Sequence, residues 1–444
     1  MMRMPDAMPL HLMLAMMQSG VLPNGWTPWS APWQSFMPEW LRPKSPIEQL
    51  NEKMQSQWQQ LGDQWQETAA QLQKNFGHPW AAGNENKREE KASAAFPDFL
   101  NPEFLSTLGT EAYNRSTGFM QGLQAYLASD YVRPEPEYDV LWQRGSATLF
   151  DLAPDRTDGL AVLCVPSLIN RSTILDLYPQ ASFVQHLKSQ GFRPLLLDWG
   201  TPGEDELDFT TADYITGYAI PALQALREAH DGPIALVGYC MGGIFTVAMA
   251  QLAALFVDAL VLLATPWDFS AEDTPRVLLE PASQLMFRQW MATQNPVAPL
   301  VIQTIFHLIN PWRVQEKYSR YPFLSEAEKT HFLAVEQWVN EGVPMPRRVA
   351  EECLIDWPQG NILATHQWKV GRRWIEPASI ACPTLAVIPT KDAIVPIGVA
   401  RPLADAIPRC DVIMPETGHV SMVVGKNART QLWLPVSKWL GERF

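Results

Sequence analysis

The sequence has few basic residues for its length, and this scarcity restricts its partners. Its 444 residues contain 34 Lys and Arg against 47 Asp and Glu, which gives a formal net charge of −13. A nucleic-acid-binding protein needs a basic face to neutralise phosphates. No polybasic run is present that would hold an anionic membrane. We therefore expect no nucleic acid among the partners of this chain.

Cysteine is scarce as well, and its spacing excludes two kinds of site. The five cysteines form an odd set without C-x-x-C spacing, and the eight histidines include no H-x-x-x-H pair. We expect neither a disulfide framework nor a zinc site, and the pattern fits a reducing cytoplasm. The five are Cys164, Cys240, Cys353, Cys382 and Cys410.

Long apolar runs are also missing. No stretch of 18 or more apolar residues occurs, so we expect no transmembrane helix. Hydrophobic residues nevertheless make up 47% of the chain and charged residues 18%, which is enough for a large buried core.

Residues 1–95 read as an N-terminal extension in three parts. The first 40 residues are rich in Trp, Met and Pro, and the prolines exclude a continuous helix. Residues 46–76 carry apolar side chains at steps of three or four, after a capping box from Ser45 to Glu48, which predicts one amphipathic helix. Residues 81–95 are polar and charged and are typical of a solvated linker. The apolar stripe of the helix has three possible partners: the catalytic domain, a second protomer or an apolar particle.

The rest of the chain predicts an α/β fold with an insertion. Residues 96–138 form a helical lead-in, with a helix expected over about 102–129, and 139–265 and 379–444 form the core. Apolar strand-like runs alternate there with helical patterns, which indicates a doubly wound, mostly parallel sheet. Residues 266–378 interrupt the alternation and are expected to form a helical cap. The strand-like runs are 140–150, 160–165, 194–199, 233–238, 259–264, 384–389 and 411–415, and the helical patterns are 180–190, 212–229 and 243–255.

A short glycine-rich motif lies between a predicted strand and a predicted helix. Gly238-Tyr239-Cys240-Met241-Gly242 has the form G-x-nucleophile-x-G of the nucleophile elbow, with Cys in place of Ser. The glycines leave room for a strained turn, and the helix N-terminus favours a thiolate. Without its flanking elements, the motif would be as consistent with a buried structural Cys in a tight turn as with a nucleophile. The strand before it and the helix after it favour a nucleophile.

The two partners of such a nucleophile appear in the expected order. Asp392 follows the strand 384–389, and His419 follows the strand 411–415. Each residue alone could be ordinary: a turn-capping aspartate and a loop histidine. Together they predict a Cys240–His419–Asp392 triad, in which the histidine moves the proton and the aspartate orients the imidazole. The oxyanion would be bound by the amide of Met241 and by a second amide from the loop after strand 160–165.

Cysteine at this position favours acyl transfer over hydrolysis. An acyl-cysteine formed from a thioester donor keeps the activation energy of that donor, whereas an acyl-serine discards it. The acyl group can then pass to a hydroxyl with a favourable change in free energy. This preference is not decisive, because cysteine hydrolases exist on the same fold.

Four motifs in order resemble those of the polyhydroxyalkanoate synthases, members of the α/β-hydrolase superfamily. They are INRSTILDLYPQASFVQHLKSQGF at 169–192, GYCMGG, KDAIVP and GHVSMVVG, and the similarity covers about 135–444. Family members often carry P-P-W before I-N, where this chain has Pro166-Ser167-Leu168.

The resemblance implies a function and a set of site residues. The substrate would be an (R)-3-hydroxyacyl-coenzyme A, with no further cofactor, and Cys240 would carry the growing chain. His419 would activate the thiol, and Asp392 would assist either His419 or the attacking 3-hydroxyl. The oxyanion amides would be those of Met241 and Ile169. Asp176 would be structural or would support the site, as would Gly238 and Gly242. The enzymes of this family act as dimers on polyester granules, so a homodimer in the cytoplasm, associated with granules, is expected.

Two other functions remain open from the sequence. The same triad could serve a thioesterase or polyester depolymerase, which would release hydroxy acid in place of polymer. The fold could also belong to a non-catalytic granule scaffold, in which Cys240 would be inert to iodoacetamide.

Overall fold

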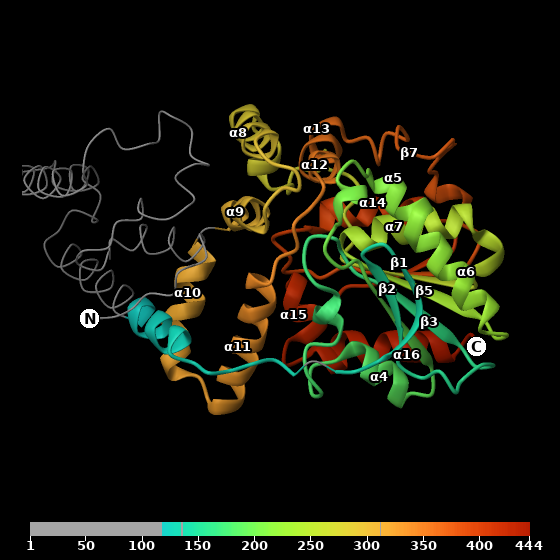
Figure 1. Ribbon diagram of the computed structural model, residues 1–444, viewed down its shortest axis with the longest axis horizontal. Coiled ribbons are helices and arrows are strands. Elements are labelled where there is room, and N and C mark those ends of the chain that lie inside the picture. The colour runs from blue at the N-terminus through green and yellow to red at the C-terminus, as the bar shows by residue number, and fades with distance from the viewer. Residues whose placement is uncertain (1–117, 135, 311) are drawn as a thin grey trace, which may run out of the picture.

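The computed structural model describes residues 118–134, 136–310 and 312–444, which fold around one eight-stranded sheet (Figure 1). The strand order is β1-β2-β4-β3-β5-β6-β9-β10. The strands from β4 to β10 pair in parallel, while β1 and β2 form an antiparallel edge. The strands are β1 Asp139–Arg144, β2 Ala147–Asp151, β3 Ala161–Val165, β4 Arg193–Asp198, β5 Ile234–Tyr239, β6 Ala259–Leu263, β9 Thr384–Val387 and β10 Cys410–Ile413. This mostly parallel sheet confirms the predicted α/β-hydrolase fold class.

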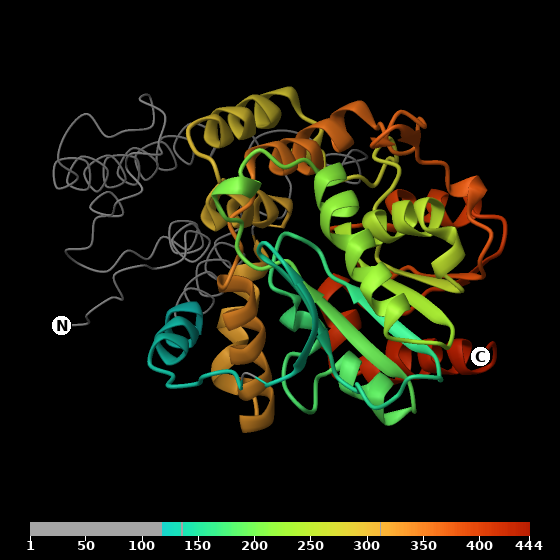
Figure 2. The ribbon, with the colours of Figure 1, turned by 45° about the vertical axis from the view of Figure 1, so that its right-hand side comes forward.

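Helices cover both faces of the sheet, because its strands are apolar on both sides. In β3, Leu163 and Val165 belong to one hydrophobic core, and Val162 and Cys164 belong to the other. Figures 1 and 2 show the two helical layers on opposite sides of the sheet. The first core includes α5 Thr211–Tyr214, α6 Ile220–Glu228, α7 Met241–Leu252 and α14 Ile397–Ala406, and the second includes α4 Phe183–Ser189, α15 His419–Val424 and α16 Leu434–Gly441.

A helical segment separates β6 from β9, at the place where a cap was predicted (Figure 1). Its helix α11 contacts the loop after β3, where Trp338 Nε1 donates to Arg171 O at 2.8 Å, and the segment ends in a two-stranded hairpin. Its elements are α8 Pro281–Ala292, α9 Pro299–Ile309, α10 Trp312–Arg320, α11 Glu326–Asn340, α12 Arg347–Glu351, η11 Glu352–Asp356, α13 Trp357–Gly360, β7 Lys369–Val370 and β8 Arg373–Trp374.

Two expected elements differ from the sequence-based prediction. The run 140–150 is a hairpin, because Gly145 turns the chain at a φ of +54°. The helix expected over 212–229 is broken by the π-helical segment η7 Ile215–Ala219.

The break follows from a proline. Pro221 has no N–H to donate to the carbonyl of Gly217, four residues earlier, and that carbonyl accepts from Arg144 Nη1 at 3.2 Å instead. The π segments η11 and η13 Arg429–Trp433 also end two residues before a proline, Pro358 and Pro435. In the described part of the chain, π segments therefore mark places where a helix accommodates a proline.

The chain reaches the sheet by way of the cap. Residues 118–127 form a helix that lies against α10 and α11. Asn340 donates to the hydroxyl of Tyr126 at 2.8 Å, and Arg133 pairs with Glu341 at 2.6 Å. The predicted helix 46–76, the linker 81–95 and most of the lead-in lie outside the described residues.

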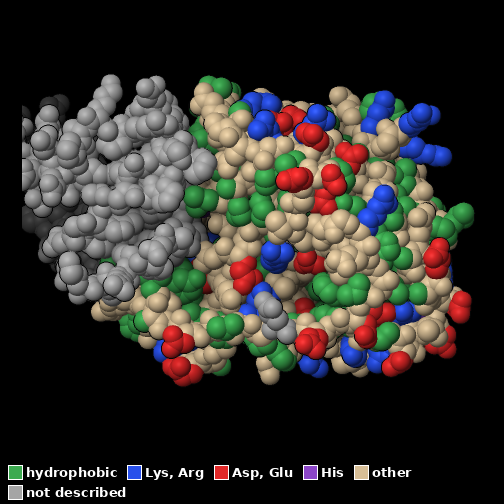
Figure 3. All heavy atoms as spheres, viewed as in Figure 1, with side chains coloured by type: hydrophobic (Ala, Val, Ile, Leu, Met, Phe, Trp, Pro, Cys, Tyr) green, Lys and Arg blue, Asp and Glu red, His purple; other side chains and the backbone are tan. Residues whose placement is uncertain are grey.

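The described helices include no membrane span, and the face drawn in Figure 3 carries charges of both signs. Among the helices of residues 118–444 that the structure places, none combines the length and apolarity needed to cross a bilayer. On the face shown in Figure 3, acidic and basic side chains are interspersed. This face therefore offers no stripe of positive charge for nucleic acid.

Candidate active site

Cys240 lies at a sharp turn between β5 and α7. Its φ of 55° and ψ of −123° lie outside the regions that most residues adopt. The turn is held by the backbone: Cys240 N donates to Leu263 O at 2.8 Å, and Gly243 N donates to Cys240 O at 2.9 Å. The residue is 8% exposed. Strain and burial of this kind are typical of a nucleophile elbow.

The two glycines of the motif are required by close packing. A methyl group on Gly238 would lie 2.3 Å from Thr246 Oγ1. A methyl group on Gly242 would lie 2.1 Å from the carbonyl oxygen of Val165, at the end of the neighbouring strand β3. Any side chain at these positions would push the strand, the turn and the helix apart.

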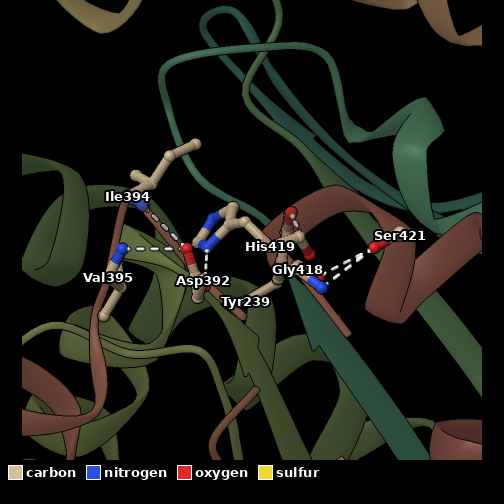
Figure 4. Close-up of polar contacts among 7 residues, drawn as sticks. All are labelled: Tyr239, Asp392, Ile394, Val395, Gly418, His419 and Ser421. Carbon is tan, nitrogen blue, oxygen red and sulfur yellow. Dashed lines mark hydrogen bonds and ion pairs between the residues drawn. The ribbon is translucent and has the colours of Figure 1, made fainter. Parts of the chain in front are cut away.

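His419 and Asp392 come together beside the elbow (Figure 4). The Nδ1 atom of His419, the first residue of α15, lies 2.7 Å from Oδ2 of Asp392. Asp392 Oδ1 accepts the amides of Ile394 at 2.8 Å and Val395 at 3.0 Å. The carboxylate is fully buried and both of its oxygens are engaged, so it fixes the orientation of the imidazole.

Cys240 lies close enough to His419 for its charge to act on the imidazole. Burial, the largest single influence, lowers the pKa of His419. The charges of Asp392 and Cys240, together with the hydrogen bond to Asp392, outweigh burial and raise this pKa above its usual range. The environment therefore favours the protonated imidazolium form of His419, which pairs with the carboxylate of Asp392.

Tyr239 is a neighbour of the histidine that the sequence did not single out. Its ring lies 5.2 Å from the ring of His419, tilted by 35°, and its hydroxyl donates to the carbonyl oxygen of His419 at 3.4 Å. Burial first, and then the charges of Cys240 and Asp392, raise the pKa of Tyr239 well above its usual value. It is therefore a protonated, buried support for the imidazole. Its position directly before the nucleophile is the signal that could have identified it.

The two residues predicted to bind the oxyanion lie on different segments next to the elbow. Met241 is the first residue of α7 and is 2% exposed. Ile169 lies in the loop after β3, and its N–H donates to Ser167 Oγ at 3.1 Å. The amide proposed for the oxyanion is therefore engaged by a side chain of its own loop.

Asp176 belongs to the end of the same loop. It is 6% exposed and accepts a hydrogen bond from the hydroxyl of Tyr138, which also accepts from Gln185 Nε2 at 3.0 Å. An isolated bridge joins Asp176 to Ser182. These contacts support the loop after β3, which agrees with a structural role for this aspartate.

The described residues contain no group of three or more His, Cys, Asp and Glu side chains suited to a metal ion. Nothing in this part of the chain therefore supplies the ligands of a metal centre.

The fold and the cysteine elbow define an α/β-hydrolase, and comparison with known proteins agrees. The model of the alpha/beta hydrolase fold family matches residues 161–426, and the chain belongs to this family. A solved structure of MenH from S. aureus covers 67% of this chain and 98% of its own, with a TM-score of 0.42 and 18% identity.

Within that family, the chain is similar to proteins named poly(3-hydroxyalkanoate) polymerase subunit PhaC. The protein from Haloferax mediterranei is 31% identical over 292 residues, which is 64% of this chain and 58% of the relative. The protein from Allochromatium vinosum is 26% identical over 361 residues, which is 78% of this chain and 98% of the relative. These matches confirm the resemblance to the polyhydroxyalkanoate synthases.

Proposed function

We propose that this chain is a polyester-forming acyltransferase that uses (R)-3-hydroxyacyl-coenzyme A and releases coenzyme A. The observation that carries the proposal is the strained cysteine at the elbow, next to an imidazole that Asp392 orients. The similarity to proteins named as poly(3-hydroxyalkanoate) polymerases supports the choice of substrate. Coenzyme A enters as part of the substrate, and the route needs no further cofactor.

The first half of the reaction forms an acyl-cysteine. His419 takes the proton of Cys240, and the sulfur attacks the thioester carbonyl carbon. The electron pair of the C=O bond moves to the oxygen, where the amide of Met241 donates a hydrogen bond. The bond to the sulfur of coenzyme A then breaks, and His419 returns the proton to that leaving thiolate.

The second half passes the acyl group to a hydroxyl. His419 removes the proton of a 3-hydroxyl group, whose oxygen attacks the acyl-cysteine and frees the sulfur. Asp392 acts on this step through the imidazole, since its carboxylate is fully buried and held by His419 and two amides. The change from thioester to oxyester makes the transfer favourable.

The setting of the enzyme follows from the same proposal. A homodimer at the surface of a cytoplasmic polyester granule would let the insoluble product leave while the soluble thioester enters. The predicted amphipathic helix 46–76 and the Trp-rich segment before it supply apolar surface for the granule. Deleting residues 1–95 should therefore shift the protein from the granule to the soluble fraction, and unchanged sedimentation would contradict this role.

Product analysis tests the catalytic proposal. The protein is incubated with (R)-3-hydroxybutyryl-coenzyme A and with longer homologues, while free thiol and polymer are measured together. Polymer formed in step with free coenzyme A is expected from the wild type. Free hydroxy acid in place of polymer would assign the triad to a hydrolase instead. A chain that releases no coenzyme A and whose Cys240 resists iodoacetamide would be a scaffold.

A further inference from the structure

The N–H of Ile169, which was predicted to bind the oxyanion, points at the side chain of Ser167. The hydroxyl oxygen of Ser167 accepts the N–H of Ile169 at 3.1 Å, and the residue is 9% exposed. An amide that donates to a side chain is not free to donate to a substrate oxygen in the same geometry. If the Ile169 N–H faces the reaction, the hydroxyl of Ser167 stands between it and the thioester.

The loop that carries Ser167 is packed tightly against the elbow. β3 pairs with β5 so that Val165 lies beside Gly238, two residues before the nucleophile. The carbonyl oxygens of Val165 and Pro166 would lie 2.1 and 2.6 Å from a methyl group on Gly242. Ser167 follows directly, so its position relative to Cys240 is set by two adjacent strands and a backbone contact.

The hydroxyl of Ser167 has a proton to offer. A serine hydroxyl accepts through two lone pairs and donates one O–H. Here one lone pair takes the N–H of Ile169, and within the described residues the proton has no acceptor. By contrast, the hydroxyl of Ser172, in the same loop, donates its proton to Asp198 at 2.5 Å. A hydroxyl that already accepts from an amide is polarised and becomes a better donor.

We propose that Ser167 is a catalytic residue, whose hydroxyl is the second donor to the oxyanion, with Ile169 acting behind it. This inference rests on the proposed acyl transfer at Cys240. As the sulfur attacks, the electron pair of the carbonyl moves to its oxygen, which then accepts from Met241 N–H and from Ser167 O–H. Ser167 transfers no proton in this step: its hydroxyl keeps its hydrogen, and the oxyanion collapses with loss of the leaving group.

Acylation kinetics of Ser167→Ala and Ser167→Thr test this assignment. The first turnover of the full-length protein is followed with p-nitrophenyl acetate and with (R)-3-hydroxybutyryl-coenzyme A. Loss of an oxyanion donor should slow acylation by about 100-fold in Ser167→Ala, mainly in kcat, and Ser167→Thr should restore most of the rate. Acylation that stays within about threefold of wild type, or rises because the Ile169 amide is released, would overturn the assignment.

Alkylation of Cys240 by iodoacetamide separates a missing donor from a damaged site. That reaction displaces iodide at a saturated carbon and forms no oxyanion, so Ser167→Ala should alkylate at the wild-type rate. A parallel loss of alkylation would show that Ser167 supports the structure only. Ser172→Ala is the matched control, since it removes another hydroxyl of the same loop; an equal loss of acylation there would also overturn the proposal.

The ester distinguishes failure of this proposal from failure of the proposed function. Acylation by p-nitrophenyl acetate needs the triad and the oxyanion donors but no polymer-forming step. Ser167-dependent acylation without polymer would overturn the synthase function alone. Polymer formation that is indifferent to Ser167→Ala would overturn the Ser167 assignment alone.

Discussion

Two histidines, one in the catalytic core and one in the cap, are equally buried, but their pKa values are shifted in opposite directions. His419 and His307 are each 8% exposed. In the core, the charges of Asp392 and Cys240 overcome burial and raise the pKa of His419. In the cap helix α9, burial and then the charge of Lys317 lower the pKa of His307 to about 4. The sign of the neighbouring charge, and not the depth of burial, separates a candidate catalytic base from a structural imidazole.

The two regions therefore respond to pH in opposite ways. His419 has a raised pKa, so its contribution to stability is complete below its unfolded pKa of about 6.5 and is lost as pH rises through the folded value. His307 has a lowered pKa, so the unfolded chain binds its proton first and stability falls as pH drops from about 6.5 to about 4. Raising the pH therefore lowers the stability of the core through His419, and lowering the pH lowers the stability of the cap through His307.

The largest effect is expected when the sulfur is removed from the core. Cys240→Ala should abolish both coenzyme A release and polymer, because no other described group replaces the nucleophile at the elbow. The folded structure should persist, with a melting temperature within about 4 °C of wild type. Retained synthesis in a purified, correctly folded variant would refute the assignment of Cys240. Cys240→Ser should transfer much less and hydrolyse slowly.

A second substitution should make the core histidine behave like the one in the cap. Asp392→Asn keeps the shape but removes the charge that raises the pKa of His419, so that burial dominates. We expect turnover to fall by about 10³-fold or more, because the imidazole loses its orientation and its counter-ion. NMR titration of His419 should show its pKa falling below the wild-type value. A value that does not move would contradict the role given to Asp392.

The cap histidine offers the converse test. Wild-type stability should fall by about 2–3 kcal/mol between pH 7 and pH 4.5 on account of His307, since its folded pKa is near 4. His307→Gln should reduce the acid loss by that amount and leave the acylation rate of Cys240 unchanged. Urea unfolding at the two pH values measures the difference. An identical acid loss in both proteins would show that other groups cause it.

The smallest effect is expected from the hydroxyl of Tyr239. Its hydrogen bond to His419 O is long, at 3.4 Å, so Tyr239→Phe should change turnover by about twofold at most. Tyr239→Leu also removes the ring beside the imidazole and should cost about tenfold. If the phenylalanine variant is as slow as the leucine variant, the hydroxyl matters more than the ring.

Much of the core was predictable because its constraints are local. The elbow was recognisable from a strand, two glycines around Cys240 and a helix, since the tight turn excludes other residues. Asp392 and His419 could be located because the fold orders its acid and its base after particular strands. Their meeting at 2.7 Å agrees with the spacing expected of a triad, while their catalytic roles remain predictions.

Contacts between distant segments were not predictable. Nothing in the spacing of residues indicates that Lys317 lies close enough to His307 to depress its pKa. The hydrogen bond of Ile169 to Ser167 depends on the backbone path of a loop without periodicity. The π segment η7 was missed because the helical pattern over 212–229 does not show how the helix accommodates Pro221.

The close approach of Gly242 to strand β3 also limits where new specificities can arise. With 2.1 Å between a hypothetical methyl group and the Val165 carbonyl oxygen, mutagenesis at position 242 should yield inactive or misfolded protein for all nineteen alternatives. Laboratory evolution of this scaffold toward other acyl donors is then best aimed at the inserted helices over the nucleophile. The elbow therefore has to stay unchanged, and new specificity for acyl donors has to come from substitutions in the inserted helices.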